Sequence, residues 1–144
     1  MNRLFEWAFS KPTPKIGFED VVQCIQSPEK YAIINTLPLQ HQSCLIAGTL
    51  DTKEEEAFIN GLLTKYMPTT KHIVLYGLHA CDETPYQKQR QLISLGITEV
   101  WVYSGGLFEW LLLQDIYGET EFPTTSEAKK NDMLRFRPTK VLQK

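Results

Sequence analysis

The sequence has little that would mark a membrane, disulfide-rich or metal-binding protein. Only three cysteines occur, Cys24, Cys44 and Cys81, and their wide, irregular spacing matches neither a zinc site nor a disulfide framework. The first residues lack the layout of a signal peptide because Glu6 interrupts a short apolar stretch. The longest apolar run, at 111–113, is far too short to span a bilayer. We therefore expect a soluble intracellular protein with reduced thiols.

Charge of one sign and cofactor motifs are also scarce. A net charge of -2 gives no general attraction to nucleic acid or to an anionic membrane. The histidines His41, His72 and His79 have no metal-ligand spacing, and no zinc or nucleotide-binding motif is present. We therefore expect no metal and no cofactor.

What the chain does contain suits one globular α/β domain. Its 144 residues, 42% hydrophobic and 22% charged, are enough to bury a full core without disulfides or metal. Apolar residues at helical spacing, with capping, proline or glycine signals at their ends, predict helices at 18–25, 53–66, 85–95 and 107–117. Compact apolar runs predict strands at 31–34, 44–50, 72–76 and 100–103, of which 44–50 is the weakest. This alternation favours a mainly parallel sheet flanked by helices.

Start signals place two of the helices more closely. Thr52 and Glu55 have the spacing of a capping box ahead of the helix at 53–66. Thr84 is predicted to cap the next helix, with Pro85 in its first position and Gln87 completing a second capping box.

Four short segments occur in the order and spacing of rhodanese-like domains: Ile33-Ile34-Asn35, the segment 45–49, the segment 73–76, and Gly105-Gly106-x-x-x-Trp110. The chain resembles that family over roughly residues 18–122. The resemblance implies a rhodanese-like three-layer α/β domain. A narrower similarity, in GGLFEWLLLQDIYG followed by FPTT, is to the rhodanese-like proteins of large DNA viruses of eukaryotes.

The resemblance also implies that the loop corresponding to the catalytic loop lacks the family's catalytic residues. Rhodanese-like enzymes carry a nucleophilic cysteine directly after the central strand, where this chain has Gly77, and often an arginine at the sixth loop position, where it has Asp82. The family's upstream aspartate and histidine correspond to Asn35 and Leu45. Carboxylates at Asp82 and Glu83 should repel anionic substrates and disfavour a thiolate. The corresponding binding loop consists of Gly77, Leu78, His79, Ala80, Cys81, Asp82 and Glu83.

Two functions remain open on this reading. The first is a non-enzymatic binding or assembly module, a viral accessory or virion protein if the narrower similarity holds, with host cytoplasm or virion as its location. The second is a sulfurtransferase or phosphatase-like enzyme that uses Cys81 as a displaced nucleophile, with His79 two residues away. For the first we expect a protein partner whose identity the sequence does not reveal.

Three parts of the chain are expected: a leader at 1–16 that packs on the body, the rhodanese-like domain at 17–124, and a basic tail at 125–144. The helix at 107–117 is apolar on more than one face, which fits either deep burial beneath the leader or an interface. In the tail, Phe136 between Arg135 and Arg137 is a weak signal for base stacking, so we do not expect a nucleic-acid partner. The sequence leaves the oligomeric state open.

Overall fold

Four strands form one parallel sheet at the centre of the computed structural model, which describes residues 14–64, 71–126 and 133–142. They are β1 (Lys15–Ile16), β2 (Tyr31–Asn35), β3 (His72–Tyr76) and β4 (Val100–Tyr103), in the spatial order β1-β4-β3-β2. Every neighbouring pair is parallel. The predicted mainly parallel α/β architecture is therefore confirmed.

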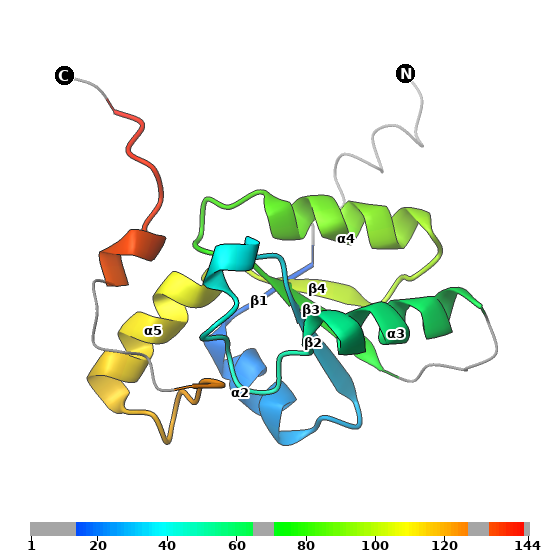
Figure 1. Cartoon of the computed structure of the whole chain (residues 1–144), viewed down its shortest axis with the longest axis horizontal. Helices are drawn as coiled ribbons and strands as arrows, with labels where there is room; N and C mark the ends of the chain where they lie inside the picture. Colours follow the sequence, from blue (N-terminus) through cyan, green and yellow to red (C-terminus); the bar gives the residue numbers. More distant parts are fainter. Residues whose placement is uncertain (1–13, 65–70, 127–132, 143–144) are drawn as a thin grey trace.

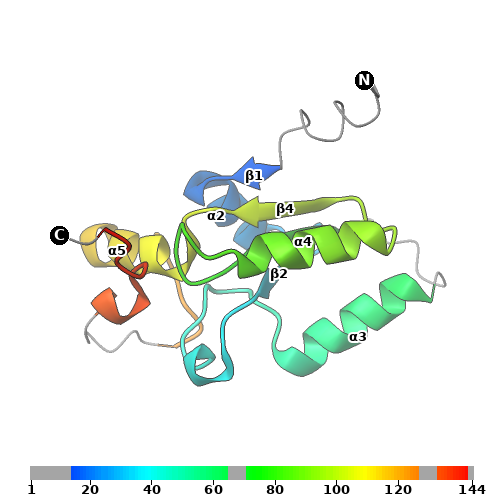
Figure 2. The same cartoon turned by 90° about the horizontal axis from the view of Figure 1, so that it is seen from above.

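Helices cover both faces of this sheet (Figures 1 and 2). α2 (Phe18–Gln26) and α5 (Gly106–Tyr117) pack on one face, and α3 (Thr52–Leu63) and α4 (Thr84–Ser94) lie over the other. Because side chains alternate along a strand, Ile33 joins the α2 and α5 cluster while its neighbour Ile34 joins the α3 and α4 cluster. Two apolar cores thus enclose the sheet, as expected for three layers.

Helices α3 and α4 each begin one residue earlier than predicted. α3 is capped by Asp51, whose carboxylate accepts the N–H of Glu54 at 2.7 Å in a complete capping box, and not by Thr52 with Glu55. Likewise Glu83, not Thr84, precedes α4, so the second predicted capping box is absent. The predicted end of α3 at Tyr66 lies outside the described residues.

The predicted strand at 44–50 is wrong. The segment forms only isolated bridges, one from Thr49 to β2 and one from Ile46 to Thr124. Gly48 has a φ of 86°, which breaks an extended conformation. The backbone of this segment instead forms hydrogen bonds with residues 123–125, among them one from the N–H of Ala47 to the carbonyl of Pro123 at 3.1 Å. The apolar residues of 44–50 include the buried Leu45 and Ile46, but the segment does not form a strand.

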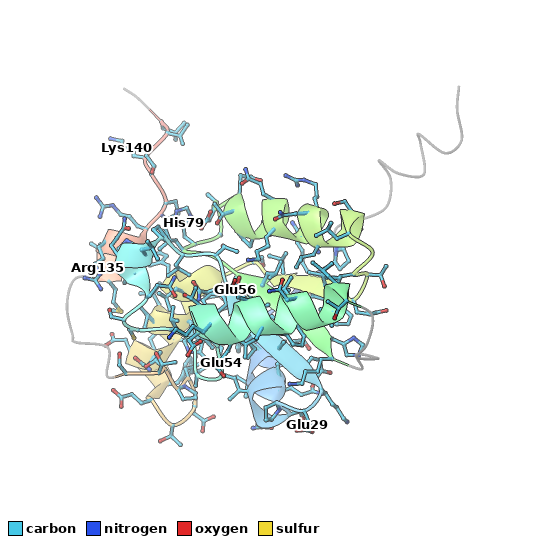
Figure 3. All side chains as sticks on the ribbon, turned by 45° about the vertical axis from the view of Figure 1, so that its right-hand side comes forward. Glu29, Glu54, Glu56, His79, Arg135 and Lys140 are labelled. Atoms are coloured by element: carbon cyan, nitrogen blue, oxygen red, sulfur yellow. The ribbon has the colours of Figure 1, made fainter. Side chains whose placement is uncertain are left out.

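Helix α5 contacts two segments that follow it in the sequence. Trp110 is fully buried and donates its indole N–H to the carbonyl of Pro123 at 3.0 Å. The short helix η2 (Met133–Phe136) contacts α5, and Phe136 packs edge-on against His41 of η1 (Leu39–His41), with ring centres 5.1 Å apart. Beyond this anchor, the side chain of Lys140 points away from the body (Figure 3).

α5 is covered on only part of its surface by the described residues. Ile116 and Tyr117 remain 69% and 64% exposed. The expected packing of the leader concerns residues 1–13, which lie outside the described part of the chain. No helix within 14–64, 71–126 or 133–142 is long and apolar enough to cross a membrane.

Candidate functional site

The 77–83 loop joins the carboxyl end of β3 to α4 and is held against the first turn of α5. The carbonyls of Gly77 and Leu78 accept backbone hydrogen bonds from that turn, at 2.9 and 2.8 Å. Gly106 makes this approach possible because its φ is 71° and a Cβ there would lie 2.7 Å from the nitrogen of His79. The loop contributes only backbone atoms to these bonds, so they place it without depending on its side chains.

The Asp82 carboxylate folds back into the loop. One oxygen accepts the N–H of Leu78 at 2.9 Å, and the other accepts the N–H and hydroxyl of Thr84 at 2.9 and 2.8 Å. A Cβ added to Gly77 would collide with this carboxylate, lying 2.9 Å from its carbon and 3.0 Å from the ring of Pro85. Asp82 therefore occupies the space that a side chain at position 77 would enter.

These contacts keep Asp82 negatively charged. Partial burial raises the pKa of its carboxyl, but hydrogen bonds from Leu78 and Thr84, with a smaller contribution from His79, outweigh burial. The net result is a pKa below the ordinary value of 3.8. In a rhodanese-like loop the amides would stabilise a thiolate or bound anion, and here the chain's own carboxylate takes the Leu78 amide.

Cys81 and His79 lie in the same loop but do not form a nucleophile and base pair. Cys81 is exposed, and its backbone N–H donates to Nδ1 of His79 at 3.1 Å. That bond requires an unprotonated Nδ1. Within the described residues, the thiol of Cys81 has no hydrogen-bond partner. Nothing here activates the thiol in the way a neighbouring base would.

The remaining residues singled out from the sequence have structural surroundings. Ala80 and Glu83 are exposed, and Glu83 makes no side-chain cap. Leu45 is buried in the core. Asn35 is also buried, and its side-chain oxygen accepts the N–H of Leu37 at 3.0 Å and the amide of Gln42 at 2.8 Å. Asn35 therefore shapes the turn after β2.

Cys24 and Cys44 do not contribute to this loop. Burial, and secondly the charge of Asp20, raise the pKa of the Cys24 thiol to about 11, so it stays protonated at neutral pH. The Cys44 thiol contacts the carbonyl of Ser126 at 3.7 Å. Elsewhere in the described chain, no three His, Cys, Asp or Glu side chains come together as a metal site would require.

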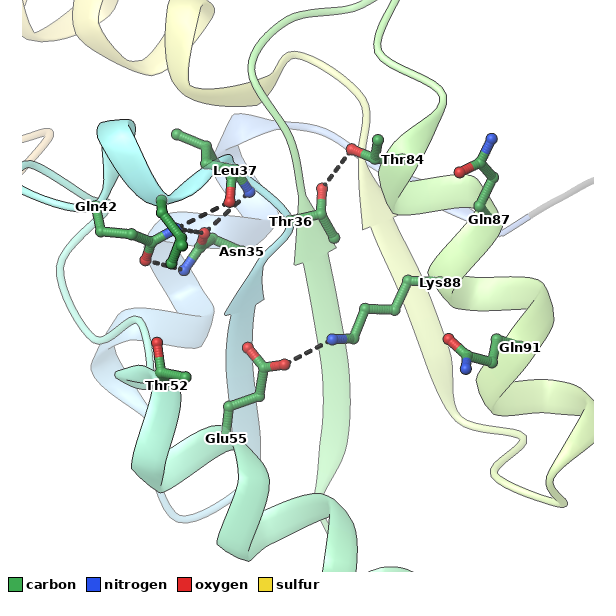
Figure 4. A pocket seen from close by; sticks show the side chains of 11 residues that line it. Asn35, Thr36, Leu37, Gln42, Thr52, Glu55, Thr84, Gln87, Lys88 and Gln91 are labelled. Atoms are coloured by element: carbon green, nitrogen blue, oxygen red, sulfur yellow. Dashed lines mark hydrogen bonds and ion pairs between the residues drawn. The ribbon is translucent and has the colours of Figure 1, made fainter.

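A polar pocket of about 420 Å³ opens beside the loop (Figure 4). It lies at the carboxyl ends of β2 and β3, between the starts of α3 and α4, where ligands of parallel sheets commonly bind. Glu55 and Lys88 form an ion pair of 2.6 Å across it, so the two charges cancel. Sequence reasoning missed this pocket because its walls come from segments distant in the chain.

Hydroxyl groups link the pocket wall to the loop. Thr36, which lines the pocket, hydrogen-bonds to Thr84 at 2.8 Å, and Thr84 in turn donates to Asp82. The pocket and the 77–83 loop are therefore parts of one polar region at the carboxyl edge of the sheet.

Comparisons with known proteins identify the fold. No protein-family model and no curated protein matches the sequence. Among solved structures, a full-length protein from Lactobacillus plantarum matches with a TM-score of 0.56 and 19% identity, over 78% of this chain and 92% of that one. The rhodanese-like domain of Alr3790 from Anabaena matches with a TM-score of 0.53 and 19% identity, covering 92% of this chain and 94% of its own.

The As-Sb reductase from Leishmania major is a third structural neighbour. It has a TM-score of 0.52 and 19% identity, with 75% of this chain and 81% of that chain covered. At such low identities these similarities establish a rhodanese-like fold and leave the activity to be argued from the site.

Proposed function

We propose that this chain is a non-enzymatic binding or assembly module built on a rhodanese-like fold. The observation that carries the proposal is the Asp82 carboxylate, which lies beside Gly77 and accepts the Leu78 N–H. A second anion at this place would meet a like charge at close range. The loop therefore has no thiol at its first position, and its Leu78 amide is already taken by a carboxylate that would repel thiosulfate, phosphate or a persulfide.

The surface that we propose for a protein partner is the polar region formed by the 77–83 loop and the adjacent pocket. In the pocket the charges of Glu55 and Lys88 offset each other, while the loop adds the carboxylates of Asp82 and Glu83. The rim also carries side chains that can form hydrogen bonds, such as Gln87. If the similarity to the proteins of large DNA viruses is correct, the chain acts as an accessory or virion protein. Detection of the chain in purified virions by mass spectrometry tests that setting.

Enzyme assays test the absence of catalysis directly. Purified protein should transfer no sulfur from thiosulfate or mercaptopyruvate to cyanide or a thiol, and should hydrolyse no phosphate ester, beyond a heat-denatured control. Turnover above this control would overturn the proposal, and its loss in Cys81→Ser would assign the activity to that thiol.

The alternative is an enzyme that uses Cys81, whose exposure makes it accessible to a substrate. One of the structural neighbours is an enzyme, the As-Sb reductase, which supports an enzymatic role for this fold. This alternative requires a thiolate at neutral pH. Iodoacetamide labelling at neutral pH, followed residue by residue by mass spectrometry, should modify Cys81 no faster than the thiol of an unstructured cysteine peptide. Clearly faster labelling of Cys81, together with turnover lost in Cys81→Ser and retained in Cys44→Ser, would favour the enzyme.

A further inference from the structure

A second pocket, of about 150 Å³, lies beneath α2, away from the 77–83 loop. Its floor is Val74 of β3, and its side walls are Tyr31 of β2 and Trp101 of β4. Helix α2 contributes Asp20 and Cys24, four residues apart on one helix face. Ile16 and Gln23 complete the lining. None of these residues belongs to the polar region described above.

Aromatic rings run across three strands at this place. His72 lies between the other two rings, with its centre 5.7 Å from Tyr31 and 5.0 Å from Trp101. The strand register places Tyr31 opposite His72 and Val74 opposite Trp101, so all four side chains project toward α2. Aromatic rings in such a wall attract cations through their negative faces.

One charge lines this aromatic pocket. Asp20 makes no ion pair with any Lys, Arg or His of the described residues. The Cys24 thiol remains neutral, since burial and the charge of Asp20 both raise its pKa. A further carboxylate, Glu99, lies 3.5 Å from His72 at the edge. The pocket thus combines aromatic walls with the exposed carboxylate of Asp20, which no cation of the described residues pairs.

We propose that the aromatic pocket binds the methylated ammonium group of an alkylamine. A volume of about 150 Å³ accommodates one compact group the size of a benzene ring. Asp20 disfavours anions. A bare ammonium or a guanidinium would lose hydrogen bonds to water that these mainly apolar walls cannot replace, whereas a trimethylammonium group has none to lose. The site is independent of the proposed function of the loop.

Calorimetric titration of the intact chain with choline tests the proposal against a ligand of the same shape without charge, 3,3-dimethyl-1-butanol. Choline should bind saturably and about tenfold more tightly than the alcohol, the range of a partly exposed cation–π contact plus an exposed carboxylate. Equal binding of the two, or no saturable binding of choline, would refute the charge-based recognition.

Two variants and a matched control locate the site. Asp20→Asn and Trp101→Leu should each weaken choline binding about threefold, since the two contacts together give the tenfold preference. Asp20 also lies in the first turn of α2, where acidic residues stabilise a helix, so Glu19→Gln in the same turn serves as the control for helix stability. Glu19 does not line the pocket. If Glu19→Gln weakened binding as much as Asp20→Asn, the site would be wrongly assigned.

Peptides distinguish a free ligand from a protein-borne one. A trimethyl-lysine peptide that binds more tightly than choline, with the unmethylated peptide much weaker, would support recognition of a methylated protein. Choline binding at least as tightly as the peptide would support a small free amine. In either case the Gly77 and Asp82 variants should leave binding unchanged.

Discussion

Replacement of Asp82 by alanine tests whether its carboxylate holds the 77–83 loop. The substitution removes three hydrogen bonds, from the Leu78 N–H and from the N–H and hydroxyl of Thr84. Loss of a comparable helix-start acceptor costs about 0.5–2 kcal/mol. An amide left without a partner adds about 1–3 kcal/mol when buried, but Leu78 is only half-buried and water can replace part of the bond. We expect a loss of about 1–2 kcal/mol, measured by urea titration.

The lowered pKa of Asp82 also predicts how the free energy of unfolding depends on pH. Because the pKa of Asp82 in the folded chain lies below its ordinary value of 3.8, its contribution is fully present above that value. It is lost as the pH falls below 3.8 through the lowered pKa. The difference in free energy of unfolding between wild type and Asp82→Ala should therefore be constant from about pH 5 to 7 and shrink in more acidic solution.

Glu83→Ala is the matched control, since Glu83 is the adjacent carboxylate, is exposed and makes no cap. It should change the free energy of unfolding by less than about 0.5 kcal/mol. Asp82→Asn, which keeps one oxygen acceptor, should fall between Asp82→Ala and wild type. If Asp82→Ala were no more destabilising than Glu83→Ala, the carboxylate would not hold the loop and the argument for an occupied anion site would fail.

Other variants test the close packing around the loop and sheet. Gly106→Ala puts a side chain at positive φ against backbone and should cost more than about 1 kcal/mol in urea titrations, whereas Gly61→Ala, at an open helical position, should add about 0.5–1 kcal/mol. Tyr76→Phe removes the acceptor of a buried N–H and should cost about 1–3 kcal/mol by the same titration. Gly77→Cys with Asp82→Arg should form a persulfide with thiosulfate, seen by mass spectrometry, while Gly77→Cys alone should not.

The sequence predicted those strands that are short, continuous apolar runs. The run His72–Tyr76 became β3, and Val100–Tyr103 became β4, because compact apolar runs of this length suit strands covered on both faces. The segment 44–50 has a similar apolar content but pairs with 123–125, a choice made by a distant part of the chain and by the conformation of Gly48. The apolar pattern of residues 44–50 alone does not show that residues 123–125 will take their hydrogen bonds.

The candidate site was predictable in position but not in its electrostatics. The order of strand, loop and helix identified 77–83, and the acidic character of Asp82 indicated poor anion binding. The direction of its side chain was not predictable, because an aspartate at this place can point to solvent or accept the Leu78 N–H. The polar and aromatic pockets were also missed, since side chains such as Lys88 and Trp101 gain their neighbours only through the strand order.

The geometry shows that the docking of the 77–83 loop onto α5 does not depend on a catalytic side chain. The bonds that dock it onto α5 involve the carbonyls of Gly77 and Leu78 and the close approach of Gly106, none of which requires a particular loop side chain. An amide turned toward the loop interior still needs an acceptor. With no thiolate beside it, the carboxylate of Asp82 meets that need. The proposed role as a binding module is therefore compatible with this fold, because the Leu78 amide keeps an acceptor with Gly77 at the first position of the loop.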